Sequence, residues 1–315
     1  MKAVTWEGVY SALLSPFDSN DNIDFKLFEK NIDAQMKAGI DGMVLAGSLG
    51  EASTLTSDEK KNLIICATEV GQNKLPVIMN IAEQSTREAI KSAQIAEKHG
   101  ANGLMVLPPM RYKSDEKETV EYFKTVAANT TLPIMIYNNP YDYKIEVTLE
   151  MFEQFEKLPN IQAVKESTRD VSNVTRLKNK FGDRFKILGG VDTLAFEELA
   201  LGADGWIAGL VNAFPAEIVA IYKLMKAGKY QQSLKIYRWF LPLLELDIHS
   251  KFAQYIKLAA TQTGIGSEYV RAPRLRLEGA EREKILAIIN SAIDSRPEIP
   301  GYAQFSTMEL MKGDN

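Results

Sequence analysis

Eight short apolar runs alternate with amphipathic helical stretches, and this alternation constrains the fold more than any other feature of the chain. The runs show little polar alternation, which is typical of strands that are buried on both faces of a parallel sheet. We expect strands at residues 10–14, 42–46, 76–81, 103–107, 133–137, 161–165, 185–188 and 205–208. Strand–helix units of this kind need right-handed crossovers, and eight of them in about 210 residues favour a closed barrel over an open sheet. The sequence therefore predicts an α/β protein with a (β/α)8 TIM barrel.

The helical patterns follow each strand and continue after the last one. They lie at residues 25–38, 57–70, 86–99, 116–128, 148–156, 171–180, 192–201, 216–225, 230–246, 250–263 and 280–295. No strand pattern appears after residue 229. We therefore expect a barrel over residues 1–228 and a C-terminal helical extension, residues 229–315, packed on the barrel.

Composition and charge exclude several classes of protein. A net charge of −4 gives no support for a nucleic-acid surface, which needs clustered lysine and arginine. The single cysteine, Cys66, excludes an intrachain disulfide, and it lies in a helical apolar pattern that is typical of core residues. His99 and His249 are not part of any cluster with metal-ligand spacing. No apolar run reaches the length of a membrane span, and the first residues lack the apolar core of a signal peptide, so we expect a cytoplasmic protein that binds no metal, membrane or nucleic acid.

The sixth apolar run ends in a lysine, Lys165. In a TIM barrel the carboxyl ends of the strands surround the active site, so this side chain is expected at the barrel mouth. An amine in a partly dry site loses hydration, which lowers its pKa and leaves more of it uncharged. An uncharged amine can attack a carbonyl or imine carbon and form a Schiff base. Lys165 is therefore a candidate nucleophile, with a surface lysine as the alternative interpretation.

Two other strand ends carry residues that could bind a substrate or take part in catalysis. The segment Gly47-Ser48-Leu49-Gly50-Glu51 follows the second run and predicts a tight turn whose backbone N–H groups could hold a carboxylate at a helix N-terminus. Tyr137 ends the fifth run and places a phenol at the mouth, where it could transfer a proton. The alternative for Tyr137 is an aromatic residue that caps the core.

Taken together, three motifs identify a family. Gly47-Ser48-Leu49-Gly50-Glu51, Tyr137-Asn138-Asn139-Pro140 and Val164-Lys165-Glu166-Ser167 resemble, in order and spacing, the dihydrodipicolinate synthase / N-acetylneuraminate lyase family. The resemblance implies a TIM barrel with C-terminal helices, usually as a homotetramer built from dimers. It also implies class I Schiff-base chemistry on small 2-oxo or 2-imino acids, with no cofactor beyond the covalent lysine adduct.

The resemblance also assigns roles to positions. Lys165 becomes the Schiff-base lysine and Tyr137 the proton-transfer residue, while Gly47, Ser48 and Leu49 form the loop that binds the substrate carboxylate.

Further positions follow from the same matching. Gly189 and Gly190 form the matching glycine turn, and Ala208 with Gly209 would line the pocket floor. A relay tyrosine contributed across the dimer is expected near Arg111, which holds the matching register, or at the neighbouring Tyr112.

Departures from the family pattern bear on the substrate. Dihydrodipicolinate synthases usually have two threonines where Ser48 and Leu49 stand, and an arginine that holds the aldehyde's carboxylate where Asp142 stands. Exchanging a carboxylate-binding cation for an anion alters binding by roughly several kcal/mol in a desolvated site. Lysine biosynthesis is therefore disfavoured.

The Tyr-Asn-Asn-Pro form and the segment after it resemble the Δ1-pyrroline-4-hydroxy-2-carboxylate deaminases of hydroxyproline catabolism. These enzymes form 2-oxoglutarate semialdehyde and ammonia, and this is the activity that we predict. Alternatives are 4-hydroxy-tetrahydrodipicolinate (dihydrodipicolinate) synthase, a sugar-acid aldolase or dehydratase of the same family, and a barrel that binds a metabolite for regulation without catalysis.

A basic segment near the C-terminus, residues 271–276, could suggest an anion site. We expect it to be a solvated loop before the last helix.

Overall fold

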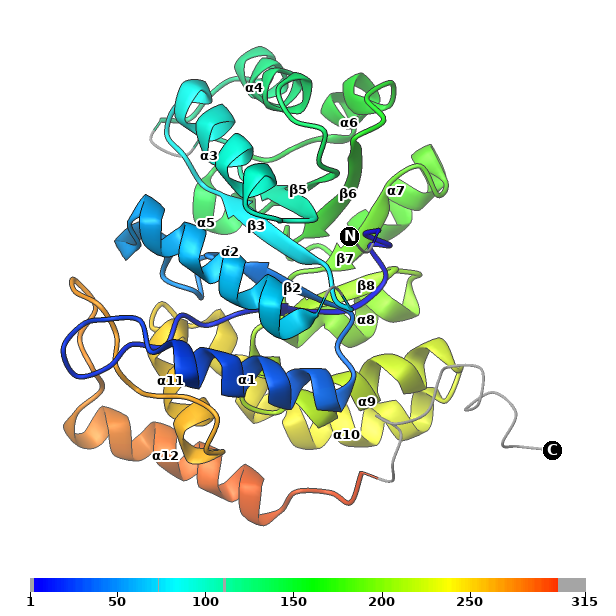
Figure 1. The fold of residues 1–315 in the computed structure, drawn as a ribbon. Helices are drawn as coiled ribbons and strands as arrows, with labels where there is room; N and C mark the ends of the chain where they lie inside the picture. The colour runs from blue at the N-terminus through cyan, green and yellow to red at the C-terminus, as the bar shows by residue number, and fades with distance from the viewer. Residues whose placement is uncertain (1–2, 73, 110–111, 300–315) are drawn as a thin grey trace.

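Each strand of the protein pairs in parallel with the next, and the eighth pairs with the first, so the sheet closes into a barrel (Figure 1). The computed structural model describes residues 3–72, 74–109 and 112–299. The strands are β1 (Gly8–Ala12), β2 (Gly42–Leu45), β3 (Val77–Ile81), β4 (Gly103–Val106), β5 (Ile134–Asn138), β6 (Ile161–Glu166), β7 (Lys186–Gly189) and β8 (Gly205–Ala208). The predicted (β/α)8 TIM barrel is confirmed.

The strands divide their side chains between two apolar cores. Val44, Ile78, Met135 and Ile207 belong to a cluster inside the barrel, and their strand neighbours belong to a larger cluster between the sheet and the helices. This follows from the two-residue period of a strand, which sends successive side chains to opposite faces. Both faces of the sheet are therefore apolar, as the uninterrupted apolar runs predicted.

Helices surround the barrel. They are α1 (Phe25–Ala38), α2 (Ser57–Gly71), α3 (Thr86–Lys98), α4 (Glu116–Ala128), α5 (Pro140–Tyr143), α6 (Leu149–Phe155), α7 (Ser172–Phe181), α8 (Ala195–Ala200) and α9 (Pro215–Lys226), with short 3-10 turns η1 (Ala52–Thr54), η2 (Asp192–Leu194) and η3 (Leu210–Asn212). Capping boxes start two of them. Thr56 and Glu59 bond reciprocally at α2, and Asp115 and Glu118 do the same at α4.

The structure differs from the predicted elements at the first strand and after the fifth. The first strand begins at Gly8, before the expected start, and Leu14 lies beyond its carboxyl end. The Leu14 N–H donates to the side-chain oxygen of Asn212 (3.1 Å) and not to a neighbouring strand, although its buried apolar side chain resembles that of a strand residue. The second difference is α5, a four-residue helix that the sequence pattern did not indicate.

Three further helices follow the barrel and gather on one side of it, next to α1 and α9 (Figure 1). They are α10 (Tyr230–Leu244), α11 (Phe252–Gln262) and α12 (Gly279–Asp294), and the 3-10 turn η4 (Glu245–Ile248) follows α10. The boundary predicted at residue 228 falls in the turn between α9 and α10.

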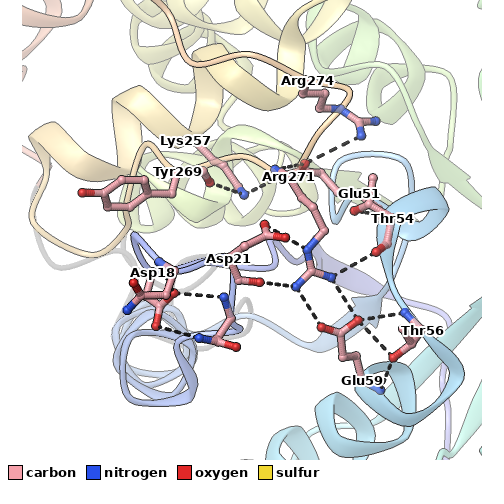
Figure 2. Close-up of polar contacts among 12 residues, drawn as sticks. Asp18, Asp21, Glu51, Thr54, Thr56, Glu59, Lys257, Tyr269, Arg271 and Arg274 are labelled. Atoms are coloured by element: carbon pink, nitrogen blue, oxygen red, sulfur yellow. Dashed lines mark hydrogen bonds and ion pairs between the residues drawn. The ribbon is translucent and has the colours of Figure 1, made fainter.

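A buried ion pair joins these helices to the loop after β2. Lys257 of α11 and Glu51 lie in direct contact, and both side chains are almost completely buried (1% and 0% exposed). Lys257 also donates to the carbonyl oxygen of Tyr269 (2.7 Å), and the backbone N–H of Arg271 donates to Glu51 (3.1 Å) (Figure 2). Each charge therefore has several polar partners, which a buried ion pair needs to offset desolvation.

The expectation of a solvated loop at residues 271–276 was wrong for its first residue. The Arg271 guanidinium is only 12% exposed and donates to both carboxylate oxygens of Glu59 (2.8 and 2.9 Å), to Asp21 and to the carbonyl of Thr54 (Figure 2). Hydrogen bonds from Arg271 lower the pKa of Glu59 although partial burial opposes this. Arg271 thus ties the start of this segment to Asp21, to Thr54 and to α2.

We expect Lys257→Met to lower the free energy of unfolding by about 3–5 kcal/mol, because it leaves the Glu51 carboxylate buried without its main partner. Urea unfolding followed by circular dichroism measures this loss. The control is Lys37→Met, because the Lys37–Asp33 pair is mostly exposed (75% and 57%) and its removal should change the midpoint little. Equal losses of unfolding free energy in the two variants would contradict the stabilising role of the buried Glu51–Lys257 pair.

Candidate active site

Lys165 lies one residue before the end of β6 and points into the barrel mouth. Ala163 belongs to the interior cluster and Val164 to the outer one, so the strand period sends Lys165 inward and Glu166 outward. Lys165 is 7% exposed and lines a cavity of about 440 Å³ at the carboxyl ends of the strands. The structure therefore places the predicted nucleophile in a secluded cavity.

Tyr137 stands opposite Lys165 on the neighbouring strand β5. The two residues share a register position, and the Lys165 Nζ lies 4.2 Å from the centroid of the Tyr137 ring. The side-chain amide of Asn139 donates to the Tyr137 hydroxyl oxygen (3.2 Å), which leaves the phenol proton free for another acceptor. Burial raises the pKa of Tyr137 to about 12, so the phenol is protonated at neutral pH and can pass on a proton.

The amine of Lys165 is desolvated. Burial disfavours the ammonium form and lowers the pKa of Lys165, although the charges of Tyr143, Asp247 and Asp192 oppose this shift. A larger fraction of this amine is therefore free at neutral pH than for a surface lysine, as Schiff-base formation requires.

Gly47, Ser48 and Leu49 line the same cavity. Among the described residues, the N–H groups of Ser48 and Leu49 donate to no backbone carbonyl. The following η1 has only three residues, so the N–H groups of the turn itself, and not a helix terminus, are available for an anion.

The ends of this loop are held from outside the cavity. The amide of Asn80 donates to the carbonyl of Ala46 (2.9 Å), and the hydroxyl of Ser15 donates to the carbonyl of Gly50 (2.8 Å). Ala46 and Glu51 have left-handed backbone angles, with φ of 50° and 57°. Strained backbone of this kind persists only where the surroundings fix it, and it is common at functional sites.

Two predicted pocket residues face away from the cavity. An added Cβ on Gly189 would meet Glu198 on the outer side, whereas Gly190 lies against Lys165 and Ser167 and lines the cavity. Ala208 belongs to the outer core, and its neighbours on either side, Ile207 and Gly209, line the cavity instead. Both corrections have one cause, since a shift of one residue along a strand moves a side chain to the opposite face.

The cross-subunit candidates lie elsewhere. Arg111 is outside the described residues, and Tyr112 is 55% exposed and does not line the cavity. A cross-subunit role for either residue stays a prediction.

Sequence reasoning missed several residues that line the cavity, among them Tyr143 and Asp247. Tyr143 enters from α5, and its hydroxyl lies 2.5 Å from Ser48 Oγ. Asp247 enters from η4 of the C-terminal helices. Burial raises the pKa of Asp247, and the nearby Asp192 raises it further. The tyrosine one turn beyond Tyr-Asn-Asn-Pro was a usable signal, but nothing in the sequence linked Asp247 to this site.

Comparison with known proteins decides the family. The model of the dihydrodipicolinate synthetase family matches residues 5–292. The chain belongs to this family. It is 31% identical over 286 residues to the 4-hydroxy-tetrahydrodipicolinate synthase of Exiguobacterium sibiricum, covering 91% of this chain and 98% of the relative. It is 30% identical over 287 residues to the enzyme of that name from Bartonella bacilliformis, with the same coverage.

Solved structures of the family agree with the fold. The 4-hydroxy-tetrahydrodipicolinate synthase of Methylacidiphilum fumariolicum SolV superposes with a TM-score of 0.86 at 26% identity, over 96% of this chain and 99% of that one. The chloride-inhibited dihydrodipicolinate synthase of Acinetobacter baumannii, solved with pyruvate, gives 0.88 at 25% identity, over 91% and 99%.

Membership in the dihydrodipicolinate synthetase family makes the protein a class I aldolase or lyase that works through a lysine Schiff base and needs no external cofactor. Within the described ranges, no group of three or more histidine, cysteine or acidic residues could hold a metal ion. In the same ranges, no helix has the length and apolar character to span a membrane.

We expect the rate of adduct formation between Lys165 and pyruvate to rise with pH and to level off below pH 10.5, the ordinary pKa of lysine. Only the free amine attacks, and burial lowers the pH at which it forms. Borohydride trapping at a series of neutral and alkaline pH values, followed by mass spectrometry, measures this rate. An inflection at the ordinary lysine value would show that the amine is solvated.

We expect Gly190→Ala to abolish adduct formation while the protein stays folded. An added Cβ would lie 2.1 Å from Ser167 Oγ and 2.7 Å from Lys165 Cε, so the lysine must move. The matched control is Gly71→Ala at the end of α2, where the Cβ meets only the flexible tip of Met43 at 3.2 Å. Normal adduct formation by Gly190→Ala would mean that Lys165 can react from a side-chain position other than the one observed against Gly190.

Proposed function

We propose that the protein is a Δ1-pyrroline-4-hydroxy-2-carboxylate deaminase, which converts this cyclic imine to 2-oxoglutarate semialdehyde and ammonia. The observation that carries the proposal is the distribution of charge in the cavity. A desolvated Lys165 amine stands beside Tyr137, and the same cavity is lined by the Gly47–Leu49 loop and by the carboxyl groups of Asp142 and Asp247.

Binding would use the single carboxylate of the substrate. The free N–H groups of Ser48 and Leu49 are suited to receive it, and this would direct the neighbouring imine carbon toward Lys165. Attack by the amine on that carbon, C2, forms a new carbon–nitrogen bond. The two protons of the attacking amine pass to the ring nitrogen by way of Tyr137, which ends in its starting state. The ring nitrogen then leaves C2, which opens the ring and gives a lysine Schiff base with a free amine at C5.

Loss of water would follow. A proton leaves C3, the hydroxyl on C4 takes up a proton and departs as water, and the double bond shifts until C5 is an imine. Hydrolysis at C5 releases ammonia, and hydrolysis of the lysine imine at C2 releases the product. One water leaves and two are consumed, so the net reaction uses one water.

The acidic side chains favour this reaction over the synthase. Ring opening creates an amine that carries a positive charge when protonated, and a carboxylate stabilises that charge. Asp142 lines the cavity and is fixed by Asn139, whose amide donates to it (2.7 Å) and whose oxygen accepts from the Asp142 N–H (3.1 Å). The same carboxylate would repel the anionic aldehyde substrate of a synthase.

A second candidate is 4-hydroxy-tetrahydrodipicolinate synthase. The names of the similar relatives support it, as do two arginines, Arg169 and Arg274, which line the cavity and could bind a second carboxylate. The Arg274 guanidinium also lies 3.7 Å from the Glu51 carboxylate, and the guanidinium carbon of Arg169 lies 3.3 Å from the centroid of the Tyr141 ring. Both arginines therefore have other partners. No comparable observation favours a sugar-acid aldolase or dehydratase, or a regulatory barrel that binds a metabolite. The homotetramer and the cytoplasmic location stay predictions.

We expect the protein to release ammonia and semialdehyde from the pyrroline substrate, and borohydride to trap the intermediate on Lys165. The assay compares this substrate with pyruvate plus aspartate semialdehyde, N-acetylneuraminate and deoxy sugar acids. Lys165→Met should lose both turnover and the adduct, while Lys180→Met on α7 should lose neither. Turnover with aspartate semialdehyde alone would replace the deaminase by the synthase, and an unchanged Lys165→Met variant would remove Schiff-base chemistry altogether.

A further inference from the structure

A second phenol reaches the cavity next to Tyr137. Tyr143 is the last residue of α5, and its ring meets that of Tyr137 edge to face, with centroids 5.5 Å apart and an angle of 81°. Its hydroxyl lies 2.5 Å from Ser48 Oγ, in the loop assigned to the substrate carboxylate. Three hydroxyl groups of one chain therefore line a single cavity with Lys165.

One side chain positions both phenols. Asn139 caps α5, because its oxygen accepts from the Asp142 N–H, and Pro140 occupies the first turn of that helix. The amide group of the same Asn139 donates one proton to Asp142 and the other to the Tyr137 hydroxyl. The orientation of Tyr143 is thus fixed by the residue that also fixes the hydrogen bonding of Tyr137.

The hydroxyl pair can move a proton in either direction. Each of Ser48 and Tyr143 can donate one hydrogen and accept another, and only one hydrogen is used between them. The other points away from the pair, which lies on the wall of the cavity. Burial raises the pKa of Tyr143, so its phenol keeps its proton at neutral pH and is available as a donor.

The proposed reaction needs two proton transfers at different atoms. One takes place at C2 and the ring nitrogen beside Lys165, where Tyr137 stands. The other protonates the hydroxyl that leaves C4, two carbons further along the substrate. With Tyr137 engaged at the first position, a second hydroxyl group on the cavity wall is suited to serve the other.

We propose that Tyr143 is a second catalytic phenol, which works with Ser48 to carry the proton lost from C3 to the hydroxyl leaving C4, within one chain. This inference rests on the proposed dehydration. As the C4–O bond breaks, Tyr143 gives its proton to the leaving oxygen, which departs as water. The proton taken from C3 returns to Tyr143 through Ser48, so both hydroxyl groups end in their starting state.

Substitution of Tyr143 by phenylalanine separates this role from that of Lys165. We expect Tyr143→Phe to lower kcat for the pyrroline substrate by on the order of 10²-fold or more, with a small change in KM. The borohydride adduct of Lys165 with pyruvate should still form. Exchange of the pyruvate methyl hydrogens in D2O, measured by NMR, should slow in the same variant, because the methyl carbon is C3 and its proton would leave through Ser48 and Tyr143.

Companion variants complete the test. Ser48→Ala should reproduce most of the loss in kcat. The double variant Ser48→Ala/Tyr143→Phe should have a kcat little below that of the less active single variant, because both residues serve one proton path. Tyr230→Phe, an exposed tyrosine on α10, is the control that should behave as the parent. Thermal unfolding checks that each variant is folded.

Several results would overturn the inference. Turnover by Tyr143→Phe within about threefold of the parent would remove the role, as would loss of the pyruvate adduct in that variant, which marks a structural defect. A large loss in Tyr112→Phe with an active Tyr143→Phe would assign the relay to the exposed tyrosine. A parent protein that forms the pyruvate adduct but turns over no hydroxylated substrate would overturn the proposed function, and this inference with it.

Discussion

A closed barrel allows only every second residue of a strand to face its interior, and the site depends on this constraint. At the carboxyl end of each strand the last inward-facing residue lies at the barrel mouth, where the apolar packing of the barrel interior ends. On β5 and β6 those positions hold Tyr137 and Lys165, which the parallel register places side by side. The same geometry that buries the core therefore also removes water from the amine and lowers its pKa.

Much of the fold was predictable because it depends on local patterns. Apolar runs of strand length and amphipathic stretches between them are sufficient to predict eight β/α units, and the motifs at three strand ends led to Lys165, Tyr137 and Ser48. The errors at Gly189 and Ala208 arose because the family resemblance points to a pair of residues at a strand end, and only one of each pair faces the cavity. The resemblance does not say which one, and a step of one residue along a strand inverts the face.

Other features could not be predicted because their partners are distant in sequence. The burial of Arg271 depends on Asp21, Glu59 and Thr54, which come from the opposite end of the chain. Tyr143 is carried by a helix of four residues, too short to give a periodic signal. Asp247 reaches the cavity only because the C-terminal helices lie beside the barrel mouth. In each case tertiary contacts decide the environment of a charged or polar group.

The Glu51–Lys257 ion pair makes the barrel and the C-terminal helices depend on each other. Glu51 ends the loop that begins at Gly47, and its left-handed backbone is held by a charge from α11. A chimera that takes its last helices from a relative by simple grafting at residue 228 would leave this carboxylate without a counter-charge unless the donor supplies a matching lysine. The two halves of the molecule can therefore be recombined only if the residues on both sides of this contact are transferred together.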